Sequence, residues 1–186
     1  MHAHLKLLLA AGIATTLLAC STHSAYPAQT AHERGNTMAL STVVPGVEYP
    51  RSDLITGGQP TSDAWPLLKA QGVSLVVNLR PSSELAGRDE AAEAAAQGLA
   101  YRQIEIAGAA DINAAHADEL WKLLGRSQGT SLVHCASGNR AGALLALGAW
   151  RQGGMTPQQA LDFGKSAGLG SLEPKVRELL GLPPEQ

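Results

Sequence analysis

The run VSLVVNLR, Val73 to Arg80, constrains the fold more than any other stretch of this chain. It is almost continuously apolar and rich in β-branched residues, which is typical of a strand buried on both faces. A second apolar run, TSLVHC, spans Thr130 to Cys135. Helical patterns lie before and after both runs, so strands and helices alternate along the chain. This alternation predicts an α/β fold with a central, mostly parallel sheet flanked by helices.

Glycines, capping residues and apolar spacing divide the rest of the domain into further elements. We expect short strands over LITGG and AYRQIEIAG, which begin at Leu54 and Ala100. Thr61 or Ser62 is the expected N-cap of the first helix, and Thr156 is that of the fifth. The expected helices cover residues 61–72, 88–98, 114–125, 140–154, 156–168 and 172–181.

The first residues do not belong to the folded domain. Leu7 to Leu18 form an apolar run that is too short to span a bilayer and suits a secretory signal peptide. The run leads into LLAC, and a small residue directly before Cys20 resembles a bacterial lipobox. The resemblance implies a lipoprotein signal peptide over residues 1–19, lipidation of Cys20 and export. Ser21 resembles the pattern of proteins on the periplasmic face of the outer membrane rather than the inner one. The alternative is an ordinary signal peptide that contains a cysteine.

Residues 20–46 are rich in Ser, Thr, His and Ala and have no apolar period. They are predicted to form a flexible tether between the lipid anchor and the domain. The folded domain is expected to span residues 47–183. The membrane is therefore an expected partner through the N-terminal anchor.

The charge of the chain excludes one class of partner. It carries 14 basic and 16 acidic residues, which gives a formal net charge of -2. Nucleic-acid binding needs a basic surface that neutralises phosphates. We therefore expect no nucleic-acid partner.

The cysteine of the domain lies in SLVHCASGNRAG, between a strand and a helix. With Cys20 lipidated, Cys135 has no partner for an intrachain disulfide. The turn leaves backbone N–H groups without intrahelical partners, and Gly138 lets them face one concavity that suits an anion. The helix dipole favours the thiolate, which is the nucleophilic form. Arg140 has the planar fork that binds two oxygens of a tetrahedral anion. The alternative is a buried, inert cysteine beside an ordinary turn.

Three motifs in order, GGQP, VVNLRPSSE and VHCASGNRAG, resemble the phosphatase-like family known from beta-lactamase-hydrolase-like proteins. That family is a branch of the cysteine-dependent protein tyrosine and dual-specificity phosphatases. The resemblance implies a protein-tyrosine-phosphatase-like fold and a phosphorylated substrate, whose identity it leaves open. It implies that Cys135 is the nucleophile, Arg140 the phosphate clamp and His134 the residue that tunes the thiolate. It assigns no metal and no cofactor. The substrate-binding residues would be His134, Ala136, Ser137, Gly138 and Asn139.

The spacing between the cysteine and the arginine departs from this family pattern. Four residues separate Cys135 from Arg140, whereas the phosphatases usually have five. Four is common in rhodanese-type sulfurtransferases, so a Cys135 persulfide is the alternative chemistry. Ala141 also replaces the Ser or Thr that often follows the arginine. His134 and the upstream NLRP favour the phosphatase. A non-catalytic anion-binding module is the third hypothesis.

A phosphatase also needs a proton donor for the leaving oxygen. Asp111 follows a predicted strand and is the candidate general acid, with a role in a turn or helix cap as the alternative. Arg80 and Glu84 follow the first buried strand, whose end should face the same crevice. They are expected either to shape the pocket or to pair with each other on the surface.

Overall fold

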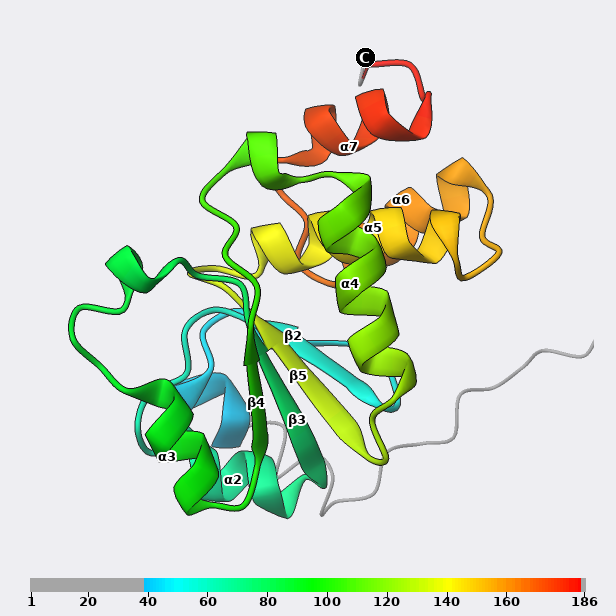
Figure 1. Ribbon diagram of the computed structural model, residues 1–186. Coiled ribbons are helices and arrows are strands. Elements are labelled where there is room, and N and C mark those ends of the chain that lie inside the picture. Colours follow the sequence, from blue (N-terminus) through cyan, green and yellow to red (C-terminus); the bar gives the residue numbers. More distant parts are fainter. Residues whose placement is uncertain (1–38, 185–186) are drawn as a thin grey trace, which may run out of the picture.

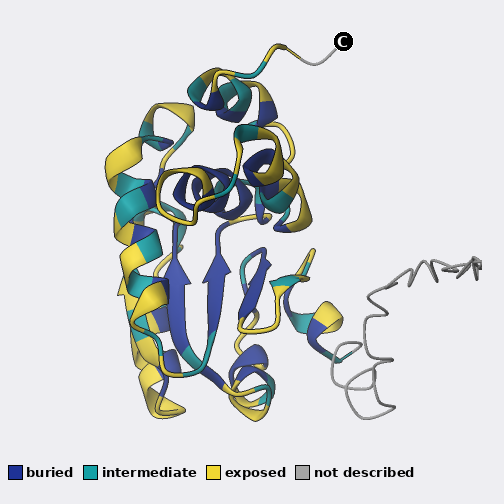
Figure 2. Ribbon diagram, turned by 90° about the vertical axis from the view of Figure 1, so that its right-hand side faces the viewer, coloured by how far each residue is buried: buried dark blue, intermediate teal, exposed yellow. Residues whose placement is uncertain are grey.

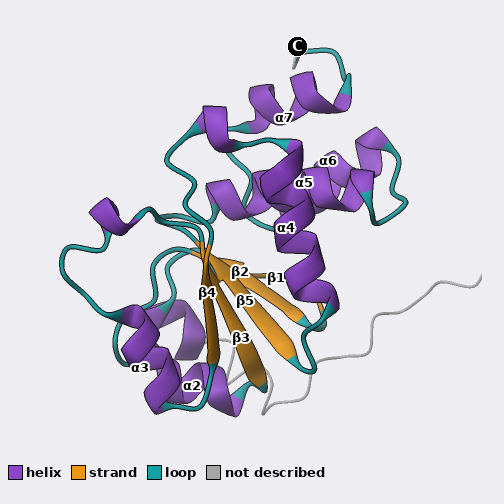
Figure 3. Ribbon diagram, in the orientation of Figure 1, coloured by secondary structure: helices purple, strands orange, loops and turns teal. Residues whose placement is uncertain are grey.

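A computed structural model describes residues 39–184 of the chain. These residues form a five-stranded sheet between helices, as Figure 1 and Figure 3 show. The strands are β1 (Glu48–Arg51), β2 (Leu54–Gly57), β3 (Val73–Asn78), β4 (Ala100–Gln103) and β5 (Thr130–His134). The helices are α2 (Ala64–Ala70), α3 (Glu90–Ala96), α4 (Ala114–Gly125), α5 (Asn139–Arg151), α6 (Pro157–Ser166) and α7 (Glu173–Leu180), with short 3-10 turns at η1 (Ser82–Glu84) and η2 (Ala109–Asp111).

The strand order is β1-β2-β5-β3-β4, and β5 is the central strand. It pairs in parallel with β2 on one side and with β3 on the other, and β4 continues the parallel set. The edge strand β1 runs antiparallel to β2. The predicted α/β fold with a mostly parallel sheet is confirmed.

Helices cover both faces of the sheet, so alternate residues of one strand enter different cores. Leu75 and Val77 of β3 pack in a core with α4, α5 and α6, whereas Val76 packs on the other face with α2 and α3. The inner strands β2, β3 and β5 are buried, whereas the edge strands β1 and β4 are largely exposed or half-buried. Figure 2 shows the buried strands at the centre and exposed residues on the outer sides of the helices and loops. Burial on both faces is the reason that β3 reads as a continuous apolar run.

The folded domain begins earlier than residue 47. Residues 39–43 are helical, and Leu40 and Val44 are 0% exposed in the core beneath α2. In residues 39–44 the chain already packs on the domain through Leu40 and Val44, so this part of the predicted tether belongs to the fold. The predicted signal peptide, Cys20 and the tether up to residue 38 lie outside the described residues.

Most predicted element ends are close to the observed ones. Thr156 caps α6, as expected: its hydroxyl accepts from Gln159 N, and the Gln159 side chain bonds back to Thr156 N. The expected cap of α2 is wrong, because Asp63 rather than Thr61 or Ser62 takes the N-cap position, without a side-chain hydrogen bond. The predicted strand over residues 100–108 ends at Gln103. None of the helices between residues 39 and 184 has the length and apolar character that crossing a membrane requires.

Candidate active site

The candidate site lies where β2, β3 and β5 end and α5 begins (Figure 1). Cys135 directly follows β5, and its side chain is buried, with 1% of the residue exposed. Its N–H donates to Gly57 O at 3.2 Å, which fixes the cysteine against the end of β2. Its Sγ accepts a hydrogen bond from Gly138 N at 3.1 Å. The sulfur is therefore already the acceptor of a backbone N–H of the following turn.

Residues 135–140 form a compact turn, which we call the anion loop. Gly138 is the N-cap of α5 and has φ +91°, a conformation that a residue with a side chain rarely adopts. The first N–H groups of α5 have no acceptor inside the helix because of helix geometry. Ala136 and Ser137 are exposed at the mouth of the loop. The backbone of the anion loop can thus supply donors to a small anion.

The GGQP motif provides the wall against which the anion loop packs. Gly58 forms a bridge with Ser137. A Cβ at Gly58 would lie 2.9 Å from Ala136 O and 3.0 Å from Pro45 O, closer than real Cβ atoms approach. Glycine is therefore needed where the anion loop and the segment before β1 both press on the end of β2.

Arg140 is held from one side and keeps its other side available. Its Nη1 donates to Glu84 Oε1 at 2.9 Å and to Ile106 O at 2.6 Å, and its Nη2 donates to Glu84 Oε2 at 2.7 Å. These bonds use three of the five guanidinium N–H donors. The remaining two, on Nε and Nη2, share one edge and can bind two oxygens of an anion. The hydrogen bonds that Arg140 donates to Glu84 raise the pKa of Arg140, and its interactions with the side chain of Cys135 act in the same direction.

Glu84 is the residue that orients the arginine. Hydrogen bonding to Arg140 holds the pKa of Glu84 below its ordinary value, and Arg80 acts in the same direction. Arg80 Nε lies 3.3 Å from Glu84 Oε2, and its Nη2 donates to Glu84 O. Arg80 and Glu84 were expected either to shape the pocket or to pair with each other. In the structure they pair, and Glu84 also holds Arg140.

Asn139 ties the anion loop to a second turn. Its Oδ1 accepts from Gly170 N at 2.8 Å and Leu172 N at 3.2 Å, and its Nδ2 donates to Ser171 Oγ at 2.8 Å. The side chain of this predicted substrate-binding residue is therefore committed to the 170–172 turn, which leaves its backbone to line the loop.

Asp111 lies in the loop that follows β4. The same loop contains Ile106, whose carbonyl oxygen accepts a hydrogen bond from Arg140. Its Oδ2 accepts from Ala107 N at 2.8 Å and from Gly108 N at 3.3 Å, so the carboxylate caps the turn at η2. This is the structural role that the sequence left as the alternative to general acid. The loop borders the site, but the carboxylate is turned into its own backbone.

His134 lies directly before Cys135, at the end of β5, and is 0% exposed. Burial lowers its pKa to about 3, and the charges of Arg80 and Arg88 act in the same direction. Its ring is therefore neutral at ordinary pH. Glu90 Oε2 lies 3.6 Å from its Nε2. Nothing in the sequence pattern marked Glu90 as part of the site, because its partners are distant in the chain. Gln59 lies in the GGQP motif, but the sequence predicted no contact for it.

Within residues 39–184, no three His, Cys, Asp or Glu side chains are grouped so that they could hold a metal ion. The donors of the site are instead backbone N–H groups and one guanidinium, a set that suits an oxyanion.

No family model matches the chain. The Beta-lactamase hydrolase-like protein of Agrobacterium fabrum is 32% identical over 119 residues, which are 62% of this chain and 27% of the relative. The Xylella fastidiosa proteins of the same name match equally. The chain thus spans about a quarter of the length of the curated relatives that it matches.

Several solved structures share the architecture. A DUF442 protein of Shewanella putrefaciens superposes with a TM-score of 0.62 at 21% identity, over 77% of this chain and 94% of that chain. PTPMT1 gives 0.57 at 14%, over 72% and 90%. TpbA of P. aeruginosa, solved in complex with pTyr, gives 0.55 at 17%, over 73% and 90%. The chain has a protein-tyrosine-phosphatase-like fold. At these identities the likeness is one of fold, and the activity has to be argued from the site.

Proposed function

We propose that this protein is a cysteine-dependent phosphatase that hydrolyses phosphomonoesters through a phosphocysteine intermediate. The observation that carries the proposal is the arrangement of Arg140 and Cys135. Glu84 and Ile106 O hold one side of the guanidinium, while the same side chain interacts with the buried thiol of Cys135, to which Gly138 N also donates. The phosphatase fold supports this assignment.

The proposed reaction has two steps. The Cys135 thiolate attacks phosphorus, the P–S bond forms, and the ester P–O bond breaks with the electron pair going to the leaving oxygen. A water then attacks the phosphocysteine, the P–S bond breaks, and phosphate and the thiolate are released. Arg140 and the loop N–H groups stabilise the equatorial oxygens in both transition states. Each preorganised donor of this kind contributes a few kcal/mol.

Asp111 is the proposed donor of the proton to the leaving oxygen. For this, its carboxylate has to turn from Ala107 N and Gly108 N towards the substrate. Its position on the loop that also contacts Arg140 supports the proposal. The substrate class that we propose to test first is an aryl phosphate, since TpbA was solved with pTyr.

Sulfur transfer is the second candidate function, because the four-residue separation of Cys135 and Arg140 makes a small cradle. In that reaction Cys135 would carry a sulfane sulfur and Asp111 would not be needed. A non-catalytic anion-binding module is the third. It would keep its affinity for anions when the thiol is removed.

One pair of assays separates the three. The reduced full chain, purified in detergent, is given an aryl phosphate in one assay and thiosulfate with cyanide in the other, beside Cys135→Ser. We expect phosphate release that is lost in Cys135→Ser. Thiocyanate formation without phosphate release would overturn the proposal in favour of sulfur transfer. Phosphate binding without turnover, unchanged in Cys135→Ser, would favour the binding module.

We also propose that the protein is exported and anchored to a membrane through lipidated Cys20, at the periplasmic face of the outer membrane. The lipobox-like LLAC supports this. Incorporation of labelled palmitate into the wild type but not into Cys20→Ala is the expected result. Equal labelling of both would contradict it.

A further inference from the structure

Beneath the anion loop, the motif residues Gln59 and Asn78 meet one buried carboxylate. Glu90 begins α3 and is 1% exposed. Its Oε2 accepts from Asn78 Nδ2 at 2.5 Å and from Tyr101 OH at 3.3 Å, and its Oε1 accepts from Gln59 Nε2. The remaining contacts of Glu90 are Arg88 Nη1 at 3.9 Å and His134 Nε2 at 3.6 Å.

The orientation of each of these donors is fixed by its other contacts. Asn78 Oδ1 accepts from Arg80 N at 2.8 Å, and Gln59 Oε1 accepts from Arg80 Nη1, so both amides must turn their NH₂ groups to Glu90. Tyr101 OH accepts from Asn78 Nδ2 at 2.9 Å, which leaves its proton for Glu90. Three neutral donors thus converge on one carboxyl group. This is the environment of a carboxylate, not of a carboxylic acid.

The groups around Glu90 act on its pKa in both directions. Burial raises this pKa and outweighs the opposing effects of the Arg88 charge, the hydrogen bond from Tyr101 and the Arg80 charge, while the Glu93 charge adds to the rise. The three donated hydrogen bonds are therefore what favours the carboxylate form. Burial also raises the pKa of Tyr101 to about 12, so this hydroxyl stays a donor. His134 is neutral, with a pKa of about 3, and carries one ring proton.

Within residues 39–184, neither ring nitrogen of His134 has a hydrogen-bond partner at ordinary distance. A buried N–H left without an acceptor is destabilising. Two acceptors adjoin the ring: the carboxylate of Glu90, 3.6 Å from Nε2, and the backbone of Cys135, whose hydrogen bonding to the ring acts to raise the pKa of His134. The charged carboxylate is the stronger acceptor of the two, which favours the proton on Nε2.

The same residues reach the other end of the anion loop. Gln59 bonds Arg80, Arg80 bonds both the backbone and the carboxylate of Glu84, and Glu84 holds Arg140. A continuous polar chain therefore runs from beneath Cys135 to the arginine. This polar chain includes Gln59 of GGQP and, from VVNLRPSSE, Asn78, Arg80 and Glu84. The proposed catalytic steps do not use these four side chains.

We propose that Glu90 is a positioning residue, which fixes His134 as its Nε2–H tautomer and, through Gln59, Arg80 and Glu84, keeps Cys135 and Arg140 in register. The inference rests on the proposed function in that Cys135 and Arg140 are taken as the reacting pair. The position of the His134 proton is a separate claim that does not require turnover.

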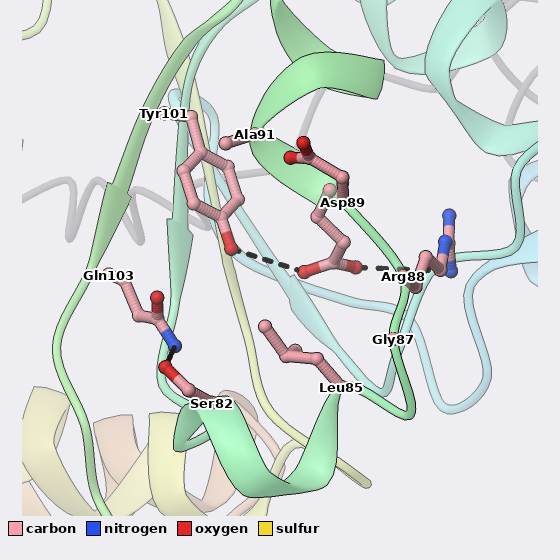
Figure 4. Close-up of a pocket in the computed structure, with 9 residues that line it drawn as sticks. Ser82, Leu85, Gly87, Arg88, Asp89, Ala91, Tyr101 and Gln103 are labelled. Carbon is pink, nitrogen blue, oxygen red and sulfur yellow. Dashed lines mark hydrogen bonds and ion pairs between the residues drawn. The ribbon is translucent and has the colours of Figure 1, made fainter.

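The surroundings of Glu90 allow a direct chemical test. A pocket of about 290 Å³ borders its outer side, lined by Leu85, Arg88, Tyr101 and others, as Figure 4 shows. Removing the carboxylate with Glu90→Ala opens a space continuous with this pocket. Small carboxylates can enter such a space, and acetamide has nearly the same shape as acetate without the charge.

The first measurement is the nitrogen chemical shifts of His134 in the wild type. We expect the Nε2–H tautomer, without titration between about pH 5 and pH 8. The Nδ1–H tautomer, or a titration in this range, would overturn the proposal whether or not the protein is a phosphatase.

The second measurement is activity, followed both as aryl phosphate turnover and as alkylation of Cys135 by iodoacetamide. We expect Glu90→Ala to lose about 10- to 100-fold in kcat/KM, as for a reacting group misplaced by about 1 Å. Acetate should restore part of the loss and acetamide none. The control is Glu93→Gln, on the same helix, whose carboxylate bonds Arg88 and Trp65 but not His134. It should match the wild type.

Two results of this second test would overturn the proposal: a folded Glu90→Ala with wild-type kcat/KM and alkylation, or equal rescue by acetamide. A different combination of results would separate the two proposals. If the wild type has the Nε2–H tautomer and the alkylation of Glu90→Ala depends on acetate, but the wild type releases no phosphate, Glu90 remains a positioning residue and the phosphatase activity is rejected.

Discussion

Replacing Gly142 by alanine tests how firmly the helix that carries Arg140 is fixed. A Cβ at Gly142 would lie 2.3 Å from Leu169 N and 2.6 Å from Gly164 O. Both are backbone atoms, so they cannot rotate away as a side chain would. Ordinary contact begins near 3.4 Å, and α5 or the 164–169 segment would have to move by about 1 Å.

The expected cost follows from this distance. Overpacking costs about 1–3 kcal/mol, and a clash with backbone belongs at the upper end of the range. Alanine returns about 1 kcal/mol through its higher helix propensity. We therefore expect the free energy of unfolding of Gly142→Ala to be lower by about 2 kcal/mol, which shifts the urea midpoint by about 1 M.

Activity should fall together with stability. The segment that must move ends in the 170–172 turn, and Asn139 binds this turn beside Arg140. A shift of about 1 Å at a reacting group can lower kcat/KM about 100-fold. Gly125→Ala is the matched control, since Gly125 ends α4 and nothing lies within 4 Å of its Cβ position. A Gly142→Ala protein with the urea midpoint and kcat/KM of the wild type would refute the steric reasoning.

Three further substitutions test separate features. Leu40→Ala should lower the free energy of unfolding by about 2–5 kcal/mol, because Leu40 is fully buried. A change below about 0.5 kcal/mol in urea titrations would show that the segment around Leu40 is not part of the folded core. Asp111→Asn keeps an acceptor for the turn but removes the proton, so kcat for an aryl phosphate should fall about 100-fold or more; a kcat equal to that of the wild type would exclude Asp111 as the acid. Arg151 lowers the pKa of Asp118 from 3.8 to about 2, so the ion pair stabilises the fold fully above the ordinary pKa and less as the pH falls towards 2. The difference in unfolding free energy between the wild type and Asp118→Asn, measured by urea titration, should therefore shrink from about pH 5 to pH 2. A difference that stays constant over this range would contradict the prediction.

The sheet and the anion loop could be predicted because their signals are local. The strands β3 and β5 are each a contiguous apolar run with glycines nearby in the sequence. The apolar character of each run is enough to predict that the strand is buried. The strand-to-helix turn around Cys135 needs only Gly138 and the following helix. In such cases the residues that carry the signal are neighbours in the chain.

The support of the site could not be predicted, because it depends on pairs distant in the sequence. Glu84 and Arg140 are 56 residues apart, and Gln59 and Glu90 are 31 apart. A glutamate on an Ala-rich helix reads as a solvated residue until the neighbouring strands are placed. Leu40 and Val44 were missed for a related reason: two apolar residues in a short segment show no period, and only the face of the sheet that they cover explains them.

The position of β5 in the sheet has a consequence for how the protein is made. Ribosomal synthesis completes β1 to β4 first, yet β2 and β3 are not neighbours, and β5 has to enter between them. Until then the chain can form only the pairs β1-β2 and β3-β4, and the anion loop that follows β5 is missing. Glu84 and Glu90 then lack their contacts with Arg140 and His134. Such non-local pairing is slow to form. The anion loop therefore forms only with the complete sheet: refolding protein should regain its reactive thiol at the same rate as it regains the sheet.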